Sequence, residues 1–268
     1  MRKHLITESA RWGTLAYRKS GDFPGTALIL IHGAVGDSRL FRYQLRHMGA
    51  RRKTIALDLP GHGHSLGAGI PTLDDFIHAI EDLRDGEGIE SFVLAGHSMG
   101  GGVCLEAARR KIRGLAGLVL VSTSPVLPVS RDLVRILERD DMDALAGLIV
   151  GAVFSRRTDL LIGFARQGLQ EMNREIIRGD VDICMGMDYS GDLAGIDLPV
   201  LAIANSGDAV IPPDLTARFG EGIPGARLII FDDNGHVPFF ENPRIFNRAV
   251  DDFLDSLDSG GAAAEGET

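Results

Sequence analysis

Short apolar runs, each ending in a glycine-rich or polar turn, recur along the chain. They are rich in Val, Ile and Leu and do not alternate cleanly with polar residues, which is typical of parallel strands buried on both faces. The runs occupy residues 26–33, 53–61, 91–98, 115–124, 198–208 and 226–236. This pattern predicts the strands of a parallel sheet.

Helix-like segments separate these runs. Residues 72–83 begin with a threonine that can cap a helix and carry acidic residues in the first turn. Residues 101–110 are apolar over much of their surface, as expected of a helix that lies on a sheet. Residues 243–257 begin with proline, which is favoured at the first helical position. The alternation of strand and helix predicts a doubly wound α/β domain.

The alternation stops between residues 125 and 196. The segments there carry apolar residues at roughly helical spacing and include no convincing strand. We therefore expect residues 1–124 and 197–258 to form the α/β core and residues 125–196 to form a helical insertion. Residues 259–268 are small and polar, and we expect them to be disordered.

Composition and charge narrow the function classes. Hydrophobic residues make up 44% of the 268 residues and charged residues 24%, as in a globular protein. The formal net charge of −9 argues against an extended nucleic-acid surface. The first residues lack the apolar segment of a signal peptide, and no apolar run approaches the length of a membrane span. The two cysteines are too few to form a disulfide framework. We therefore expect a soluble cytoplasmic protein.

A candidate nucleophile lies in the sequence LAGHSMGGG, residues 94–102, where Ser98 stands between two glycines. Such a match arises by chance about once in five chains of this composition, so the pattern alone decides little. Here, however, it joins a predicted strand to a predicted helix, which is the context of a strained turn that exposes a serine hydroxyl. We therefore predict that Ser98 is a catalytic nucleophile.

The serine hydroxyl is a weak nucleophile and needs a base, which must in turn be oriented by an acid. His236 follows the last predicted strand in a loop, and the order of serine before histidine is that of hydrolases with this kind of turn. Asp208 ends an earlier predicted strand, whereas Asp232 and Asp233 share the loop of His236 and are poorly placed to hold its far nitrogen. We predict a catalytic triad of Ser98, Asp208 and His236.

An oxyanion hole needs two N–H donors, and the residues for both are present. Met99 supplies the N–H that follows the nucleophile, and Ala34 lies in the turn after an earlier predicted strand. The candidate pocket residues are His97, Phe154, Phe164, Met172, Met185, Met187 and Val237. Packing of the insertion against the sheet is the simpler explanation for most of the apolar ones, because spacing alone does not distinguish a core from a pocket.

Positive charges in the insertion suggest one class of partner. The arginines concerned are Arg156, Arg157, Arg166, Arg174 and Arg178. They could meet an acidic acyl-carrier protein or a substrate carboxylate, but the acidic residues interleaved with them favour a solvated face. The predicted chemistry needs no metal and no organic cofactor.

Five segments together resemble the successive motifs of the α/β-hydrolase superfamily, in its order. They are HGAVGDS (32–38), DLPGHGHS (58–65), GHSMGG (96–101), SGDAVIPP (206–213) and NGHVPFFENP (234–243). The resemblance implies an eight-stranded, mostly parallel sheet with helices on both faces and a helical lid after the sixth strand. It also implies the same triad, and structural roles for Asp58, Gly61, Gly63, Glu241 and Pro243.

Single positions depart from particular subclasses of that superfamily. Ser98 stands where dehalogenases and epoxide hydrolases carry aspartate, and Val237 stands where carbon–carbon bond hydrolases carry tryptophan. Gly102 replaces the arginine of menaquinone-pathway relatives, and Ala34 replaces the aromatic residue of perhydrolases. The remaining resemblance is to carboxylesterases, enol-lactone hydrolases, monoacylglycerol lipases and acyl-carrier methyl esterases.

The leading hypothesis is hydrolysis of a small or medium carboxylic ester through an acyl-enzyme. An enol-lactone or an acyl-carrier methyl ester is the alternative substrate. A non-hydrolytic receptor for a small ligand is an alternative of another class, which the complete set of triad candidates disfavours.

Overall fold

The computed structural model describes residues 5–9, 11–155 and 159–264, and one eight-stranded sheet forms its centre. The strand order is β1-β2-β4-β3-β5-β6-β7-β8. The strands are β1 (Leu5–Ser9), β2 (Gly13–Ser20), β3 (Ala27–Ile31), β4 (Thr54–Leu57), β5 (Phe92–His97), β6 (Leu115–Val121), β7 (Val200–Asn205) and β8 (Arg227–Phe231). Only the pairings of β2 with β1 and with β4 are antiparallel. The predicted eight-stranded, mostly parallel sheet is confirmed.

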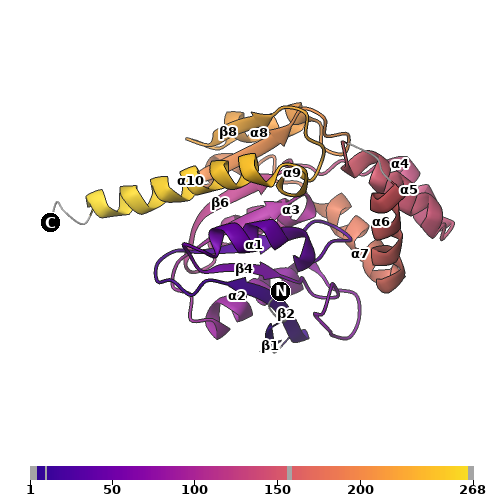
Figure 1. Cartoon of the computed structure of the whole chain (residues 1–268), viewed down its shortest axis with the longest axis horizontal. Coiled ribbons are helices and arrows are strands. Elements are labelled where there is room, and N and C mark those ends of the chain that lie inside the picture. The colour runs from indigo at the N-terminus through magenta and orange to yellow at the C-terminus, as the bar shows by residue number, and fades with distance from the viewer. Residues whose placement is uncertain (1–4, 10, 156–158, 265–268) are drawn as a thin grey trace.

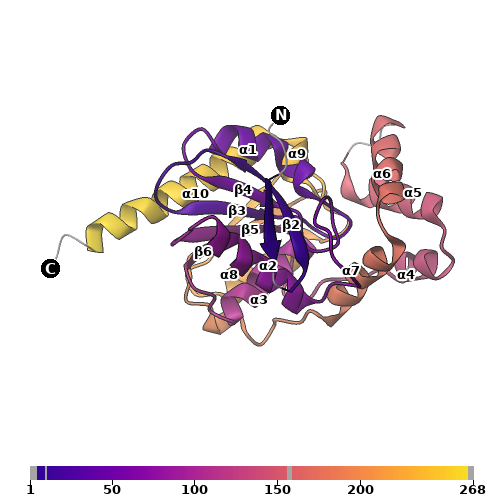
Figure 2. The ribbon, with the colours of Figure 1, turned by 90° about the horizontal axis from the view of Figure 1, so that it is seen from below.

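Helices cover both faces of this sheet (Figures 1 and 2). On one face lie α1 (Arg42–Met48) and α10 (Pro243–Ala264), and on the other lie α2 (Leu73–Gly86), α3 (Met99–Arg109) and α8 (Pro213–Gly222). Short helices η1 (Ser38–Phe41), η2 (Leu193–Gly195) and α9 (Pro238–Glu241) fill connections. This two-sided cover explains why the central strands read as continuous apolar runs.

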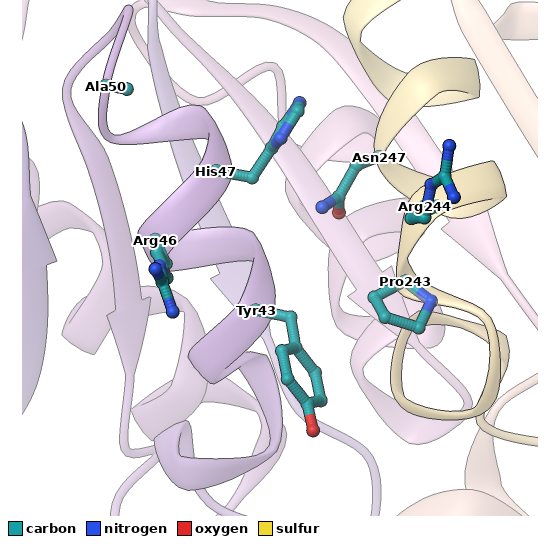
Figure 3. Close-up of a pocket in the computed structure, with 7 residues that line it drawn as sticks. All are labelled: Tyr43, Arg46, His47, Ala50, Pro243, Arg244 and Asn247. Carbon is teal, nitrogen blue, oxygen red and sulfur yellow. The ribbon is translucent and has the colours of Figure 1, made fainter.

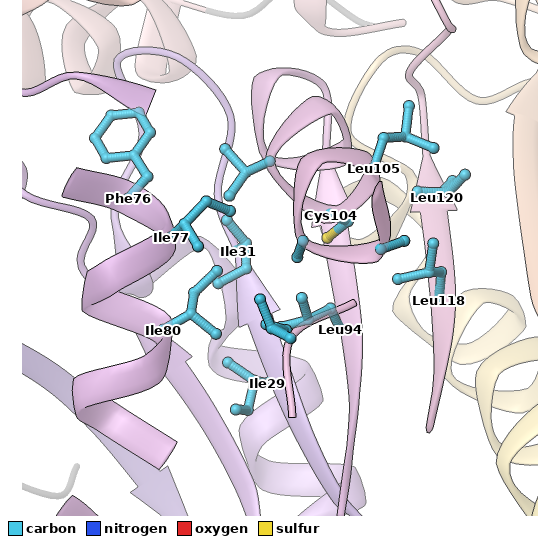
Figure 4. Close-up of a cluster of buried hydrophobic side chains, with 14 of the residues drawn as sticks. Ile29, Ile31, Phe76, Ile77, Ile80, Leu94, Cys104, Leu105, Leu118 and Leu120 are labelled. Atoms are coloured by element: carbon cyan, nitrogen blue, oxygen red, sulfur yellow. The ribbon is translucent and has the colours of Figure 1, made fainter. Parts of the chain in front are cut away.

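Side chains of β3 show how one strand supplies two cores. Ile29 and Ile31 point into the core shared with α2 and α3, where Phe76 and Cys104 also pack (Figure 4). Leu28 and Leu30 point to the opposite face and join the core beneath α1 and α10. Successive residues of a strand face opposite sides of a sheet, so every residue of β3 is buried.

The helical insertion lies between β6 and β7, at one end of the molecule (Figures 1 and 2). Its helices are α4 (Arg131–Glu138), α5 (Met142–Val153), α6 (Asp159–Glu171) and α7 (Arg174–Gly186). Val126 and Asp188 form an antiparallel bridge at its base, and the N–H of Tyr189 donates to the carbonyl of Pro125 at 2.9 Å. Leu145 and Ile177 belong to a small apolar core of its own.

The C-terminal segment differs from the expected disorder of residues 259–268. Helix α10 continues to Ala264, and residues 265–268 lie outside the described part of the chain. Extending a helix costs far less than nucleating one, and alanines 262–264 are the best helix formers, so the docked part of α10 propagates through the two glycines. In the described part of the chain, no helix is both long and apolar enough to cross a membrane.

Candidate active site

Ser98 lies on the sharp turn between β5 and α3, with φ of 52° and ψ of −119°. A positive φ is strained for a residue with a side chain, and such strain concentrates at functional turns. The turn needs its flanking glycines. A Cβ on Gly100 would lie 2.5 Å from the carbonyl oxygens of Ile31 and His32, and one on Gly96 would overlap the carbonyl of Gly100. The predicted strand–turn–helix context of Ser98 is therefore present.

Ser98 is also the accessible residue of this turn. It is partly exposed, whereas its neighbours His97 and Met99 are buried. The N–H of Ser98 donates to Val121 at the end of β6, and its carbonyl accepts from the hydroxyl of Thr123. These contacts use the backbone of Ser98, and among the described residues its hydroxyl forms no hydrogen bond.

Asp208 and His236 meet as a buried pair at the ends of β7 and β8. The Nδ1 of His236 lies 2.8 Å and 3.1 Å from the two carboxylate oxygens of Asp208. Oδ1 of Asp208 also accepts the N–H groups of Val210 and Ile211, each at 2.9 Å, so the carboxylate is held from behind. Because Nδ1 must donate to the carboxylate, Nε2 of a neutral imidazole keeps its lone pair and can act as a base.

The turn of residues 33–36 brings Gly33, the neighbour of Ala34, close to the serine turn. The N–H of Gly36 donates to the carbonyl of Gly33 at 3.1 Å, and a Cβ on Gly33 would lie 3.0 Å from Cβ of Ser98. Met99 begins α3, where the first N–H groups of a helix have no intrahelical acceptor. Within the described residues, no protein acceptor takes the N–H of Ala34 or Met99.

His97 contacts the loop that carries His236. Its Nε2 donates to the carbonyl oxygen of His236 at 2.9 Å, and the two rings lie 4.6 Å apart. Burial, and then the neighbouring His236, lower the pKa of His97 well below the ordinary imidazole value. A neutral His97 that donates from Nε2 therefore holds the backbone of His236, and its predicted place in the lining of a pocket stays a prediction.

The whole arrangement can be compared with known proteins. A model of the alpha/beta hydrolase family matches residues 28–249. The chain belongs to this family. It is 29% identical, over 90% of its length, to the dihydrolipoyllysine-residue acetyltransferase component of the acetoin cleaving system of Pseudomonas putida, of which it spans 66%. It is 24% identical to the pimeloyl-[acyl-carrier protein] methyl ester esterase of Nitrosomonas europaea, over 85% of this chain and 95% of that protein.

A solved structure extends this comparison to three dimensions. The enol-lactonase of Burkholderia xenovorans LB400 superposes with a TM-score of 0.86 at 21% sequence identity. The match covers 94% of this chain and 100% of that one. It confirms the fold of an alpha/beta hydrolase.

The predicted pocket residues of this alpha/beta hydrolase occupy several different environments. Met185 is 55% exposed at the end of α7, whereas Met187 is buried against Gly102 and Val237 lies in the core beneath α10. Met187 and Val237 therefore contribute to packing and Met185 lies at the surface, and a role of these three in lining a pocket stays a prediction.

The remaining pocket candidates lie in the insertion. Phe154 is partly buried, with its ring 6.1 Å from that of Phe240, and Met172 packs at the edge of the insertion core. The side chain of Phe164 lies outside the described part of the structure. Phe154 and Met172 therefore stay candidates for the substrate side of the site.

The insertion also forms hydrogen bonds with the loop of His236 and with the helix that follows it. The carbonyl of Val153 accepts the N–H of His236 at 2.8 Å, and Ser155 hydrogen-bonds to the carboxylate of Glu241 through both its N–H and its hydroxyl. The resemblance to the superfamily implied that Glu241 positions the last helix, and its contact with the insertion was not predicted. The end of α5 is thus part of the support for the histidine loop.

Asp180 of α7 forms a second link between the insertion and the core. Its Oδ2 lies 2.9 Å from Nε2 of His62, and the other ring nitrogen of His62 lies 3.0 Å from the carbonyl of Pro60. Both side chains are fully buried. Because each ring nitrogen faces an acceptor, the preferred form of His62 is the doubly protonated imidazolium. The sequence analysis identified neither Asp180 nor its pairing with His62.

The pKa of His62 reflects this pairing. Burial lowers it, but the charge and hydrogen bond of Asp180, the carbonyl of Pro60 and the charge of Asp58 together raise it above the ordinary imidazole value. The ring of His32 lies 4.8 Å from that of His62, and His32 is kept neutral by burial and by His62, which both lower its pKa. His62 is therefore the protonated member of this histidine pair.

Replacing His62 by glutamine should lower the melting temperature by about 5 °C or more at pH 6, since breaking a buried ion pair is costly. A histidine whose pKa is higher in the folded state than in the unfolded state stabilises the protein at pH values below the ordinary imidazole pKa. This contribution is lost as the pH rises through the raised pKa. The difference between wild type and His62→Gln should therefore shrink toward alkaline pH in thermal unfolding. His64→Gln, at an exposed neighbour, is the control, and a constant difference at all pH values would contradict the prediction.

Five arginines of the insertion were predicted as possible contacts for an acidic partner, and the three of them that the structure describes are paired with acidic residues. Arg166 lies 3.0 Å from Asp143, and Arg174 and Arg178 both contact Asp140. Arg156 and Arg157 lie outside the described residues. These pairs are exposed and fit a solvated face. The described residues include no group of three or more side chains suited to hold a metal ion.

A groove of about 400 Å³ lies between α1 and α10, on the face of the core away from α3 (Figure 3). Tyr43, Arg46, His47 and Arg244 are among its lining residues, and no triad candidate contributes to it. Because the proposed nucleophile lies at the start of α3, this groove is separate from the candidate active site.

Proposed function

We propose that this alpha/beta hydrolase cleaves a small or medium carboxylic ester through an acyl-enzyme formed on Ser98. One observation carries the proposal. The strained, accessible Ser98 shares the end of the sheet with a His236 whose Nδ1 is held by the buried carboxylate of Asp208. An oriented histidine and a partly exposed serine at the same edge of the sheet are the components that nucleophilic catalysis requires.

In the proposed mechanism, Oγ of Ser98 attacks the ester carbonyl while Nε2 of His236 accepts its proton. The carbonyl oxygen becomes an oxyanion, which the N–H groups of Ala34 and Met99 stabilise. The resulting imidazolium, stabilised by Asp208, protonates the leaving alcohol. His236 then activates a water molecule that hydrolyses the acyl-enzyme and frees Ser98.

The surroundings of the turn of residues 33–36, here called the oxyanion turn, favour an apolar acyl group. Val35, next to Ala34, packs against the core of the insertion together with the partly buried Val129, Ile136 and Met172. Such an apolar environment excludes water and strengthens the hydrogen bonds to a developing oxyanion. The printed functions of two similar proteins, an enol-lactonase and an acyl-carrier methyl ester esterase, also concern ester or lactone bonds.

An acyl-carrier methyl ester is the second candidate substrate, and the curated relative from Nitrosomonas europaea favours it. The predicted partner contacts Arg166, Arg174 and Arg178 give it little support, because they are already paired with acids. An enol-lactone is consistent with the same chemistry, since its hydrolysis passes through the same acyl-enzyme.

A series of p-nitrophenyl esters from acetate to decanoate tests the proposal. We expect multiple turnover with a maximum at one chain length, which would also size the acyl pocket. Absence of turnover across the series would contradict the proposed substrate class and favour a lactone or carrier-bound ester. Binding of such ligands without any turnover would instead support a receptor.

A further inference from the structure

We propose that Asp180, a residue of the helical insertion, is a positioning residue for the oxyanion hole. The proposal rests on the proposed ester hydrolysis at Ser98. Oδ2 of Asp180 accepts the N–H of Val35 at 2.8 Å, and Val35 directly follows the proposed donor Ala34. A carboxylate on α7 thus holds the oxyanion turn of the core.

The backbone conformation of the turn of residues 33–36 shows why it needs a stabilising contact from outside the turn. Val35 has a φ of 53°, a left-handed conformation that is disfavoured for a β-branched residue. It occupies the third position of a turn closed by the hydrogen bond from Gly36 to Gly33, where glycine or asparagine is preferred. The conformational preference of valine therefore disfavours the observed turn, whereas the hydrogen bond from the N–H of Val35 to Asp180 stabilises it.

The same turn determines where the N–H of Ala34 points. The carbonyl of Gly33 and the N–H of Ala34 belong to one trans peptide group, so they point in opposite directions. Because the carbonyl accepts from Gly36 inside the turn, the N–H of Ala34 is directed outward from it. A change in the conformation of Val35 would break this hydrogen bond and turn the peptide group away from its present direction.

The burial of Asp180 supports a positioning role for its carboxylate at the N–H of Val35. Only 1% of the residue is exposed, and Oδ1 has no hydrogen-bond partner among the described residues. Burial of a carboxylate is costly unless it is paired, and Oδ2 pairs with both His62 and Val35. His62 therefore supplies a positive charge 2.9 Å from the buried carboxylate that holds the turn.

Asp180→Ala should lower kcat by about tenfold to a hundredfold, because loss of a whole oxyanion donor costs about a hundredfold or more. KM should change by less than about threefold, since the ground-state carbonyl depends little on the hole. The affinity for a trifluoromethyl ketone should fall by the same factor as kcat/KM. Oγ of Ser98 adds to the ketone carbon, the serine proton passes to His236, and the ketone oxygen becomes the anion in the hole.

Asp180→Asn should keep kcat within about fivefold of wild type, because its amide oxygen can still accept the N–H of Val35. It should nevertheless melt at a lower temperature, since it loses the charge that pairs with His62. The matched control is Asp141→Ala, which removes another acceptor of the insertion, from the N–H of Ala144. This control should lower stability modestly and leave kcat unchanged.

The outcomes separate the positioning role from a merely structural one. Unchanged kcat and unchanged ketone affinity in Asp180→Ala, with a lower melting temperature alone, would overturn the proposal. An equal loss of kcat in Asp141→Ala would also overturn it. If Asp180→Ala does not fold, Asp180→Ser carries the same test, because its shorter polar side chain withdraws the acceptor from Val35. Failure of the proposed function would show separately, as hydrolysis by wild type that survives Ser98→Ala.

Discussion

Replacing Ser98 by alanine should lower ester hydrolysis about a millionfold, to the level of the buffer, because the substitution removes the atom that forms the acyl-enzyme. Protein stability should be unchanged. The recorded contacts of Ser98 with Val121 and Thr123 use its backbone, and alanine can keep the same backbone at a φ of 52°. Steady-state turnover of a p-nitrophenyl ester, together with thermal unfolding, measures both expectations.

Ser122→Ala is the matched control for this variant. Ser122 also has a positive φ, of 47°, and directly follows the neighbouring strand β6, but its hydroxyl accepts a hydrogen bond from the buried Asn205. The control should lose some stability and keep its activity. Hydrolysis that persists in Ser98→Ala would remove the nucleophile from the proposed mechanism, whatever the control does.

The sheet could be predicted from apolar runs only where strands are buried on both faces. The runs located β3 to β8, but the pattern did not locate β1 (Leu5–Ser9) and β2 (Gly13–Ser20). These two form the antiparallel edge of the sheet, and β2 mixes buried with half-exposed residues. An edge strand is covered incompletely, so its sequence carries a weaker apolar signal.

The candidate triad was predictable for a local reason. Ser98, Asp208 and His236 each follow the carboxyl end of a strand and lie within two residues of a glycine, so each carries a short signature in the sequence. Asp180 has no such signature, because it is one acidic residue on an amphipathic helix. Its partners His62 and Val35 lie 118 and 145 residues away in the chain, and only the folded structure brings them together.

Asp208→Asn should lower kcat about ten-thousandfold while leaving the fold intact, because it fixes the wrong tautomer of His236. The structure determines how the amide would lie. Oδ1 of Asp208 accepts two backbone N–H groups, from Val210 and Ile211, so the asparagine oxygen must take that position. Its NH₂ group then occupies the place of Oδ2, 2.8 Å from Nδ1 of His236.

A donor at that place requires Nδ1 to accept, which moves the imidazole proton to Nε2 and removes the base that Ser98 needs. The loss should therefore appear in kcat, with a small change in KM, when the ester concentration is varied. Asp232→Asn is the control, since Asp232 is an exposed acid in the loop of His236, and it should retain activity within about twofold. A severe loss in Asp232→Asn, with an active Asp208→Asn, would assign the orienting acid to the loop and would require His236 to rotate away from Asp208.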